Sequence, residues 1–202
     1  MTDPFVFAVT VLVLLAVPGP TNSLVATSGA VAGVRRSLKL VPVEVAGYLI
    51  AVTALGLLLR PIMASFPGLA MILRGVVGIY LLVLAVKLWR QGQRSMIHET
   101  DAAAAGAIGI TQVFVTTLLN PKAIVFALGI IPFGSHLLPA YLAGFAVLIA
   151  VVATAWIVTG ATLGRAAHRR GRGHVVPRVG AATIGAFAIV MMLGPIVARM
   201  TR

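Results

Sequence analysis

The stretch Val17-Pro18-Gly19-Pro20-Thr21-Asn22 interrupts a long apolar run that begins at Phe5. Pro18 and Pro20 have no backbone N–H, and each proline ring clashes with the preceding turn of a helix. The residue before each proline is also disfavoured in the α-helical region. Inside a membrane, such irregular backbone is tolerated only where it is buried in protein or lines a polar cavity. The stretch therefore predicts a broken helix beside a polar pathway.

A second break is predicted at Asn120-Pro121-Lys122, again within apolar surroundings. Its single proline makes this break looser, but the same backbone argument applies. We expect the two breaks to face each other across one substrate pathway.

The composition places both breaks inside a membrane protein. Of the 202 residues, 60% are hydrophobic and only 10% are charged, whereas a soluble domain carries about 25% charged residues. A net charge of +12 would favour nucleic-acid binding in a soluble protein. Here the basic residues lie in short loops between apolar runs, where they set topology, so no nucleic-acid partner is expected. The chain has no cysteine, which excludes disulfides, thiol catalysis and thiolate metal sites.

Apolar segments long enough to span a membrane recur along the chain. A spanning helix needs about 20 mostly apolar residues. The sequence therefore predicts an all-α integral membrane protein with six transmembrane helices, of which the first and fourth are broken. The predicted spans cover residues 5–30, 40–59, 69–89, 108–132, 139–163 and 179–198.

Loop charge predicts the orientation of these spans. Lysine and arginine concentrate in cytoplasmic loops, and here they concentrate in the first, third and fifth loops. We therefore expect a multi-pass protein of the plasma (inner) membrane with both termini extracytoplasmic. The arginines of the fifth loop can also contact anionic lipid head groups. The basic residues of the three loops are Arg35, Arg36, Lys39, Lys87, Arg90, Arg94, Arg165, Arg169, Arg170, Arg172 and Arg178.

The order of the spans predicts an inverted repeat. A linker at about residues 91–105 separates three spans from three, and because three is odd the second half inserts in the opposite orientation. Each half begins with a broken helix, and transporters of this type bind substrate near the midplane between such helices. We therefore expect one transmembrane transporter domain over residues 1–202, with repeats at about 5–90 and 106–199. Small-residue faces on the spans permit a homodimer.

Lys122 lies near the centre of the fourth predicted span. An unpaired lysine at that depth costs about 2.5–3.5 kcal/mol on insertion scales. In one interpretation its side chain snorkels toward the membrane surface or caps the carbonyls that Pro121 frees. In the other it faces the pathway as a cation. In the pathway it can pair with a substrate carboxylate or with Glu44.

Glu44 is the only acidic residue inside a predicted span, near the cytoplasmic end of the second. It either pairs with Lys39 or Arg36 at the membrane interface, or it acts within the pathway. In the pathway it would be the proton-coupling group or the partner of a substrate ammonium.

Asn22 and Asn120 flank the two breaks. Each side-chain amide can donate and accept hydrogen bonds, so each can cap a broken helix, contact substrate, or do both. The half-helix that follows a break presents free N–H groups and the positive end of its dipole, which favours a carboxylate. Weaker candidates at a similar depth are Thr21, Gln112, Thr116 and Thr117.

The sequence contains no pattern for catalysis, a metal or a cofactor. The four histidines are scattered and have no carboxylate partner at metal-ligand spacing. No nucleophile–base pair and no phosphate-binding glycine loop is present. We therefore expect a transporter rather than an enzyme, with a small-molecule substrate and membrane lipid as its partners.

Three sets of motifs follow one another along the chain. They are Pro18-Gly19-Pro20 with Gly33, Arg35 and Arg36, then Ile79-Tyr80-Leu81 with Ala85-Val86-Lys87-Leu88, then Leu119-Asn120-Pro121-Lys122-Ala123 with Ile131-Pro132-Phe133. In this order and spacing the chain resembles the LysE/RhtB family of bacterial amino-acid exporters, nearly from end to end. The resemblance implies six spans and export of small amino acids or related metabolites, driven by the proton gradient.

The resemblance also implies the substrate-binding residues. The family usually reads Pro-Gly-Pro-Asn-Thr where this chain reads Pro-Gly-Pro-Thr-Asn, which displaces the amide by one residue, or about 100° of rotation in a helix. Family members often carry an aspartate in the second span, and Tyr48 occupies that position in this chain. Tyr48 is therefore a further candidate for the pathway. Glu44 lies one turn earlier on the same helical face. The residues carried over by position, with the neighbouring Thr21 included, are Pro18, Gly19, Pro20, Thr21, Asn22, Asn120, Pro121 and Lys122.

We therefore predict a proton-coupled exporter of a small amino acid or related metabolite. The substrate carboxylate would meet Lys122 and the amides at the breaks, and Glu44 would meet the substrate ammonium or carry the proton. Alternating access would come from one half rocking against the other. One alternative is a non-transporting membrane scaffold or export-accessory protein, which has no need of midplane breaks. Another is an ion or metal permease, which would need more intramembrane acids or histidines.

Overall fold

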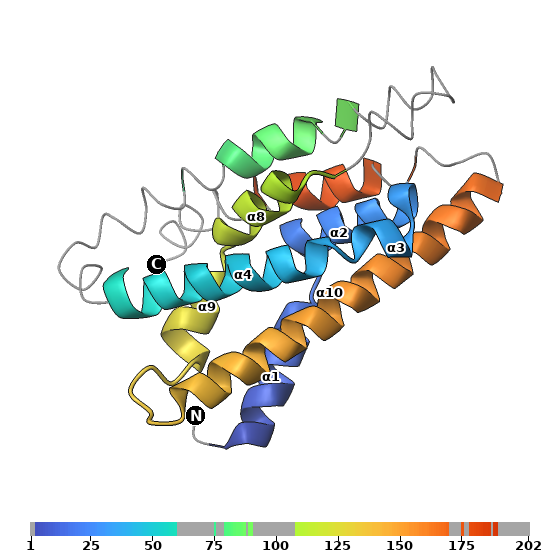
Figure 1. Cartoon of the computed structure of the whole chain (residues 1–202). Helices are drawn as coiled ribbons and strands as arrows, with labels where there is room; N and C mark the ends of the chain where they lie inside the picture. The colour runs from blue at the N-terminus through green and yellow to red at the C-terminus, as the bar shows by residue number, and fades with distance from the viewer. Residues whose placement is uncertain are drawn as a thin grey trace, which may run out of the picture.

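The computed structural model describes residues 3–59, 75, 79–87, 89–90, 108–169, 175, 178–186 and 188–189. Within these residues the secondary structure is helical, without strands (Figure 1). The predicted linker, the start of the third predicted span and the end of the sixth lie outside the described residues.

The first predicted span is broken, as the prolines indicate. Helix α1 (Pro4–Ala16) and helix α2 (Pro20–Ala32) meet at a bend of 63°. The side chain of Asp3 caps the first free amides of α1, and a proline at the start of each helix has no N–H to leave unsatisfied. Gly19, between the two helices, has an extended backbone. The break is therefore a local consequence of the Pro-Gly-Pro sequence.

The second predicted span is continuous. Helix α3 (Val34–Ser37) leads into α4 (Leu40–Thr53), which continues as the π-helical segment η1 (Ala54–Leu59). Gly33 joins α2 to α3 with φ 78° and ψ 167°, a backbone conformation that is open to glycine alone. Residues Val34–Leu57 are long and apolar enough to cross a membrane.

The fourth predicted span is broken as well. Helix α8 (Ile110–Leu118) ends before Asn120, and α9 (Lys122–Val125) begins directly after Pro121. The chain then continues as a second π-helical segment, η2 (Phe126–Ile130), which packs against η1.

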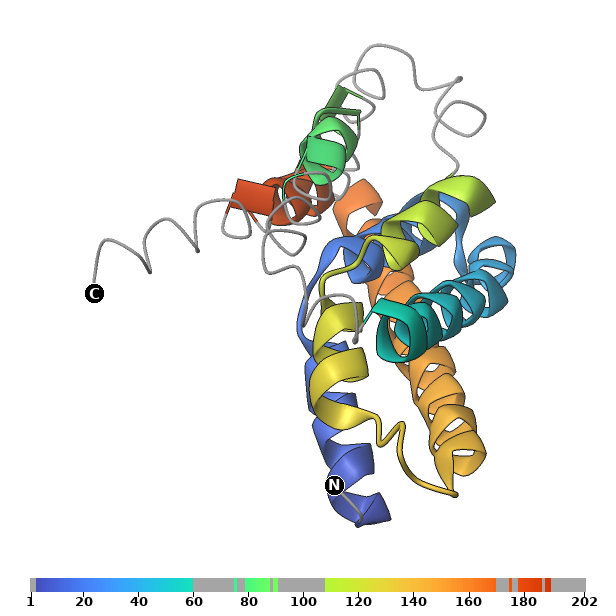
Figure 2. The same ribbon diagram turned by 90° about the vertical axis from the view of Figure 1, so that its left-hand side faces the viewer.

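The longest of the described helices is α10 (Leu138–Arg169), which packs against α1, α2 and α4 (Figures 1 and 2). Its closest approach is to α2. There Gly29 faces the backbone carbonyl of Ile157, and Gly160 faces that of Ala26, so a Cβ at either glycine would collide with backbone. Small residues allow such close packing of membrane helices.

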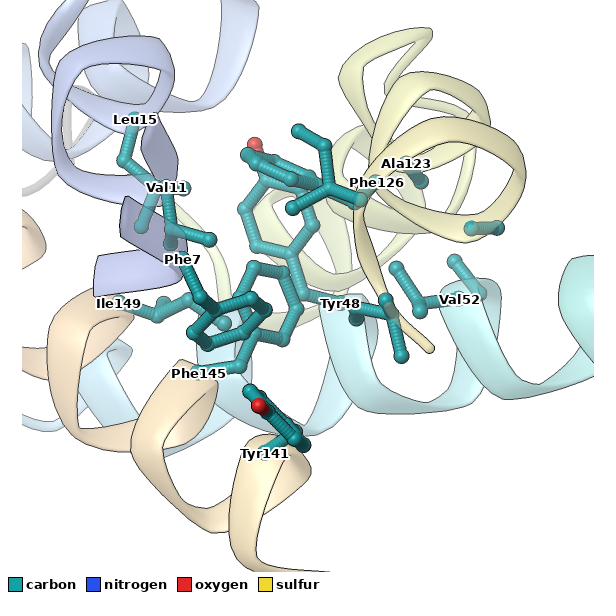
Figure 3. Packing of buried hydrophobic residues seen from close by; sticks show 14 of the residues in the cluster. Phe7, Val11, Leu15, Tyr48, Val52, Ala123, Phe126, Tyr141, Phe145 and Ile149 are labelled. Atoms are coloured by element: carbon teal, nitrogen blue, oxygen red, sulfur yellow. The ribbon is translucent and has the colours of Figure 1, made fainter. Parts of the chain in front are cut away.

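In the described part of the chain, buried apolar side chains form two groups. The first lies between α1, α4, α9, η2 and α10, and Figure 3 shows Tyr48 and Phe145 between the residues of α1 and those of α9 and η2. The rings of Phe126 and Phe145 pack edge to face with centroids 4.9 Å apart, and the Tyr48 ring lies 6.1 Å from each. The second group joins α2, α4, α8 and α10 through Leu24, Leu40, Val113 and Ile157, among others.

Large apolar side chains also cover the outside of the molecule. On α10, Val147, Val151 and Val158 are exposed at spacings that place them on one face. Among the described residues, two helices are long and apolar enough to cross a membrane, or three if α1 and α2 count as one broken span. The protein is thus helical with apolar spans, and the count of six spans and the 3+3 inverted repeat stay predictions.

Candidate functional site

The two helix breaks meet at Asn120. Its Nδ2 donates hydrogen bonds to Thr21 Oγ1 at 3.0 Å and to the Tyr48 hydroxyl oxygen at 2.8 Å. Its Oδ1 accepts a hydrogen bond from the backbone N–H of Lys122 at 3.1 Å, so the same amide caps α9. Asn120, Thr21 and Tyr48 are all buried. The two breaks therefore face each other, and one side chain joins them.

Asn22 caps the break in its own helix. Its Nδ2 donates to the carbonyl oxygen of Leu15 at 2.7 Å and to that of Val17 at 3.0 Å. Both acceptors lie at the end of α1, where the bend has removed their helical donors. Of the two roles predicted for this residue, capping is the one seen, and substrate contact stays a prediction.

Lys122 reaches across from α9 to the same two carbonyls. Its Nζ donates to Val17 O and, at 3.5 Å, to Leu15 O. The side chain passes over Gly19, where a Cβ would lie 3.2 Å from Lys122 Cε. Of the alternatives predicted for Lys122, capping of carbonyls is the one seen, but these carbonyls belong to the first break and not to the one at Pro121.

Glu44 is buried in α4 with 2% of its surface exposed, and its Oε2 has no hydrogen-bond partner within the described part of the chain. Lys39 and Arg36, its predicted interfacial partners, are exposed. Within the described part of the chain, Glu44 forms no ion pair with either of them. The interfacial alternative is therefore wrong, because α4 places this carboxyl in the interior.

Tyr48 lies one turn after Glu44 and is nearer the centre of the site than the sequence indicated. Its hydroxyl oxygen accepts from Asn120, and its ring is held edge to face by Phe126 and Phe145. A tyrosine at this position therefore supplies a neutral polar group to the meeting point of the breaks.

The weaker candidates on α8 form a separate set of contacts. Thr116 Oγ1 donates to the carbonyl oxygen of Gln112 at 2.7 Å and lies 3.0 Å from the Tyr80 hydroxyl. Gln112 Nε2 is buried without a partner among the described residues. Thr117 Oγ1 donates to Val113 O at 2.7 Å. Within the described part of the chain none of these side chains bonds to Asn120, and the link to it is a backbone turn, in which the N–H of Asn120 donates to Thr117 O at 3.1 Å.

The N-termini of the two half-helices differ. No side chain of the described residues caps α2, whose N-cap is Gly19, so its first N–H groups stay available to an anion. At α9, by contrast, the N–H groups of Lys122 and Ala123 both donate to Asn120. Free amides were expected at both breaks, and the structure offers them at the first. Of the prolines and glycine there, Pro18 is exposed, whereas Gly19 and Pro20 are buried.

The carbonyl oxygens of Leu15 and Val17 are the site groups that residue-type reasoning missed. Apolar side chains give no signal for a polar role. A signal was present in the backbone, because a helix that stops at a proline frees the carbonyls of its last turn.

The arrangement combines the half-buried ammonium of Lys122 with a buried carboxyl, an uncapped helix start and neutral hydrogen-bonding groups. Among the described residues, no group of three histidine, cysteine, aspartate or glutamate side chains could hold a metal ion. The site is therefore suited to binding a small polar molecule with charged ends.

A family model described as "LysE type translocator" matches residues 12–195, nearly the whole chain. No curated protein and no solved structure matches the chain.

Proposed function

We propose that this chain, which belongs to the LysE type translocator family, exports a small amino acid or a related metabolite across the bacterial plasma (inner) membrane. Members of the family are transporters. The chain's membership in this family and its apolar helices make it a membrane protein. The observation that carries the proposal is the meeting of the two helix breaks at Asn120. The Lys122 ammonium reaches from α9 to the end of α1, and the buried carboxyl of Glu44 lies on α4 one turn before Tyr48.

The polar groups suit the two charged ends of an amino acid. The uncapped start of α2 is the positive end of a helix dipole, and the Lys122 ammonium is a strong donor, so both attract a carboxylate. Glu44 supplies negative charge for an ammonium on the other side. A zwitterion bound in this way would contact both halves of the chain, which is what alternating access of two rocking halves requires.

Glu44 is the proposed proton-coupling group. The absence of a hydrogen-bond donor to its Oε2 within the described residues supports this role. An intramembrane carboxyl without a fixed partner can bind a substrate ammonium in one step and a proton in another.

The test is amino-acid efflux from dipeptide-loaded cells that express the wild type, Lys122→Ala, Glu44→Gln or Lys39→Ala at matched membrane levels. The wild type should accelerate efflux of at least one amino acid. Lys122→Ala should reduce that rate about tenfold or more, since a charge-assisted hydrogen bond contributes about 1.5–3 kcal/mol. Glu44→Gln should abolish the response of efflux to an imposed proton gradient. Lys39→Ala, which removes an exposed lysine outside the site, should export at the wild-type rate.

If Lys122→Ala and Glu44→Gln insert normally and export at the wild-type rate, the proposed site is wrong. A flux that neither saturates nor responds to the proton gradient would favour an ion permease. Co-purification with a stable partner, without flux of any compound in a broad panel, would favour a scaffold or export-accessory protein.

A further inference from the structure

We propose that the backbone carbonyls of Leu15 and Val17 form a site for a small monovalent cation, and that the Lys122 ammonium is its built-in occupant. The wild type then needs no external cation at this place. A chain without this ammonium would bind one there, either a primary ammonium ion or an alkali ion. The inference does not depend on which compound is exported.

The first observation is that both carbonyls have lost their helical donors. In a continuous helix, Leu15 O would accept from the N–H of residue 19 and Val17 O from that of residue 21. The 63° bend between α1 and α2 and the extended backbone of Gly19 direct those N–H groups elsewhere. The two oxygens therefore converge at the negative end of the α1 dipole, where the described residues supply them with no backbone donor.

The second observation is that each oxygen receives two side-chain donors. Asn22 Nδ2 and Lys122 Nζ both contact Leu15 O, and both contact Val17 O. A carbonyl oxygen has two lone pairs, so each is fully used. One of the two donors is neutral and local, whereas the other is a cation that comes from the far half of the chain. Unwound carbonyls and half-helix C-terminal ends are the groups that bind coupling cations in transporters with broken helices.

The third observation is the path of the lysine side chain. Lys122 Cε and Nζ run over Gly19, within 3.2 Å and 3.3 Å of where a Cβ would stand. The glycine thus leaves room for the end of the side chain. Truncation at Cβ in Lys122→Ala would leave an opening about the size of a short alkylammonium ion, with the two carbonyls at its end.

The experiment measures thermal unfolding of the purified full-length protein in detergent at constant ionic strength. N-methylglucamine, which is too bulky for the opening, is replaced stepwise by methylammonium or by Na⁺. The midpoint of Lys122→Ala should rise saturably, by about 3 °C at ten times the dissociation constant. The wild type and Lys39→Ala should respond equally little to either cation. A response to methylammonium alone identifies an ammonium site, and a response to Na⁺ as well identifies a general monovalent-cation site.

Two further variants keep the test decisive if Lys122→Ala does not fold. Lys122→Gln keeps a neutral donor on a shorter side chain and should show a smaller rise with the same cations. Lys122→Met fills the opening with apolar atoms and should not respond. A midpoint of Lys122→Ala that is the same in all three salts would overturn the proposal, and if Lys122→Ala does not fold, so would an unchanged midpoint of Lys122→Gln; a cation response of the wild type would overturn it as well. Either result leaves the export proposal standing, and a failure of export in cells would leave the cation response standing.

Discussion

At the level of single residues, Asn120 joins the two halves of the described chain through one amide. It holds Thr21 from α2 and Tyr48 from α4, and it also caps the helix that begins at Lys122. Both polar groups of the Asn120 side chain are therefore hydrogen-bonded. Because the side chain is buried, removal of one hydrogen-bond partner leaves an unsatisfied buried group, which destabilises the fold by about 1–3 kcal/mol.

Asn120→Ala should accordingly lower the free energy of unfolding by about 1–3 kcal/mol, and it should reduce efflux because it separates the two breaks. Thermal unfolding of the purified protein measures the first effect. Gln112→Ala is the matched control, since its Nε2 is buried without a partner among the described residues and its loss should cost little. Equal effects of the two substitutions would show that the Asn120 network does not stabilise the fold.

Gly19 is predicted to act through Lys122 rather than through its own backbone. Its φ of −161° is accessible to alanine, but the new Cβ would lie 3.2 Å from Lys122 Cε, so the end of the lysine side chain would have to shift by a few tenths of an ångström and its bonds to the carbonyls would weaken. Gly19→Ala should therefore impair export at nearly wild-type stability.

Gly33→Ala is the contrasting variant for this prediction. No atom of the described residues lies within 4 Å of a Cβ at this position, but φ 78° with ψ 167° strains any other residue by about 1–3 kcal/mol. It should lower the unfolding midpoint and leave export per folded molecule unchanged. Efflux and thermal unfolding are measured on both variants. Loss of stability in Gly19→Ala together with loss of export in Gly33→Ala would contradict the prediction.

At the level of elements, the crossing of α2 and α10 brings two backbones into contact. Alanine at Gly160 would place its Cβ against the carbonyl of Ala26, and backbone cannot move aside as a side chain can. This contact fixes the half-helix that carries Thr21 and Asn22, so packing far from the site positions the site.

Gly160→Ala should destabilise the protein by about 1–3 kcal/mol through overpacking. Gly144→Ala, in the same helix, places its Cβ more than 4 Å from every other described side chain or backbone outside its own turn, and it should be neutral or stabilise by up to about 1 kcal/mol through helix propensity. The yield of folded protein and the unfolding midpoint distinguish the two. A neutral Gly160→Ala would mean that the helices are farther apart in the membrane.

At the level of the whole molecule, loop charge predicts that the first loop is cytoplasmic and the fourth extracytoplasmic. The chain has no cysteine, so single cysteines report position without background. Both Leu38, in the first loop, and His136, in the fourth, are exposed.

A membrane-impermeant maleimide should label His136→Cys in intact cells and Leu38→Cys only after the cells are opened. Neither substitution removes a lysine or arginine, so the charge pattern that sets the orientation is kept. Labelling of Leu38→Cys in intact cells would reverse the predicted orientation.

Features that arise from local chemistry were predictable from the sequence. Pro18, Pro20 and Pro121 break their helices because a missing N–H and a ring clash act within one turn. The apolar composition and the motifs around the breaks indicated a membrane translocator, in agreement with the family match. The approach of the two breaks was also expected, because polar groups inside an apolar chain must find one another.

The choice of partners depended on the tertiary structure. Lys122 binds a carbonyl 105 residues earlier, and Asn120 binds a hydroxyl 72 residues earlier. Any free carbonyl near the midplane would satisfy an ammonium, so residue types alone leave several pairings equal in energy. The bend after α1 and the close packing of α2 on α10 bring Leu15 and Val17 within reach of Lys122, while α4 carries Glu44 into the interior. These distances follow from how the helices pack, and packing is a property of the whole chain rather than of any stretch of it.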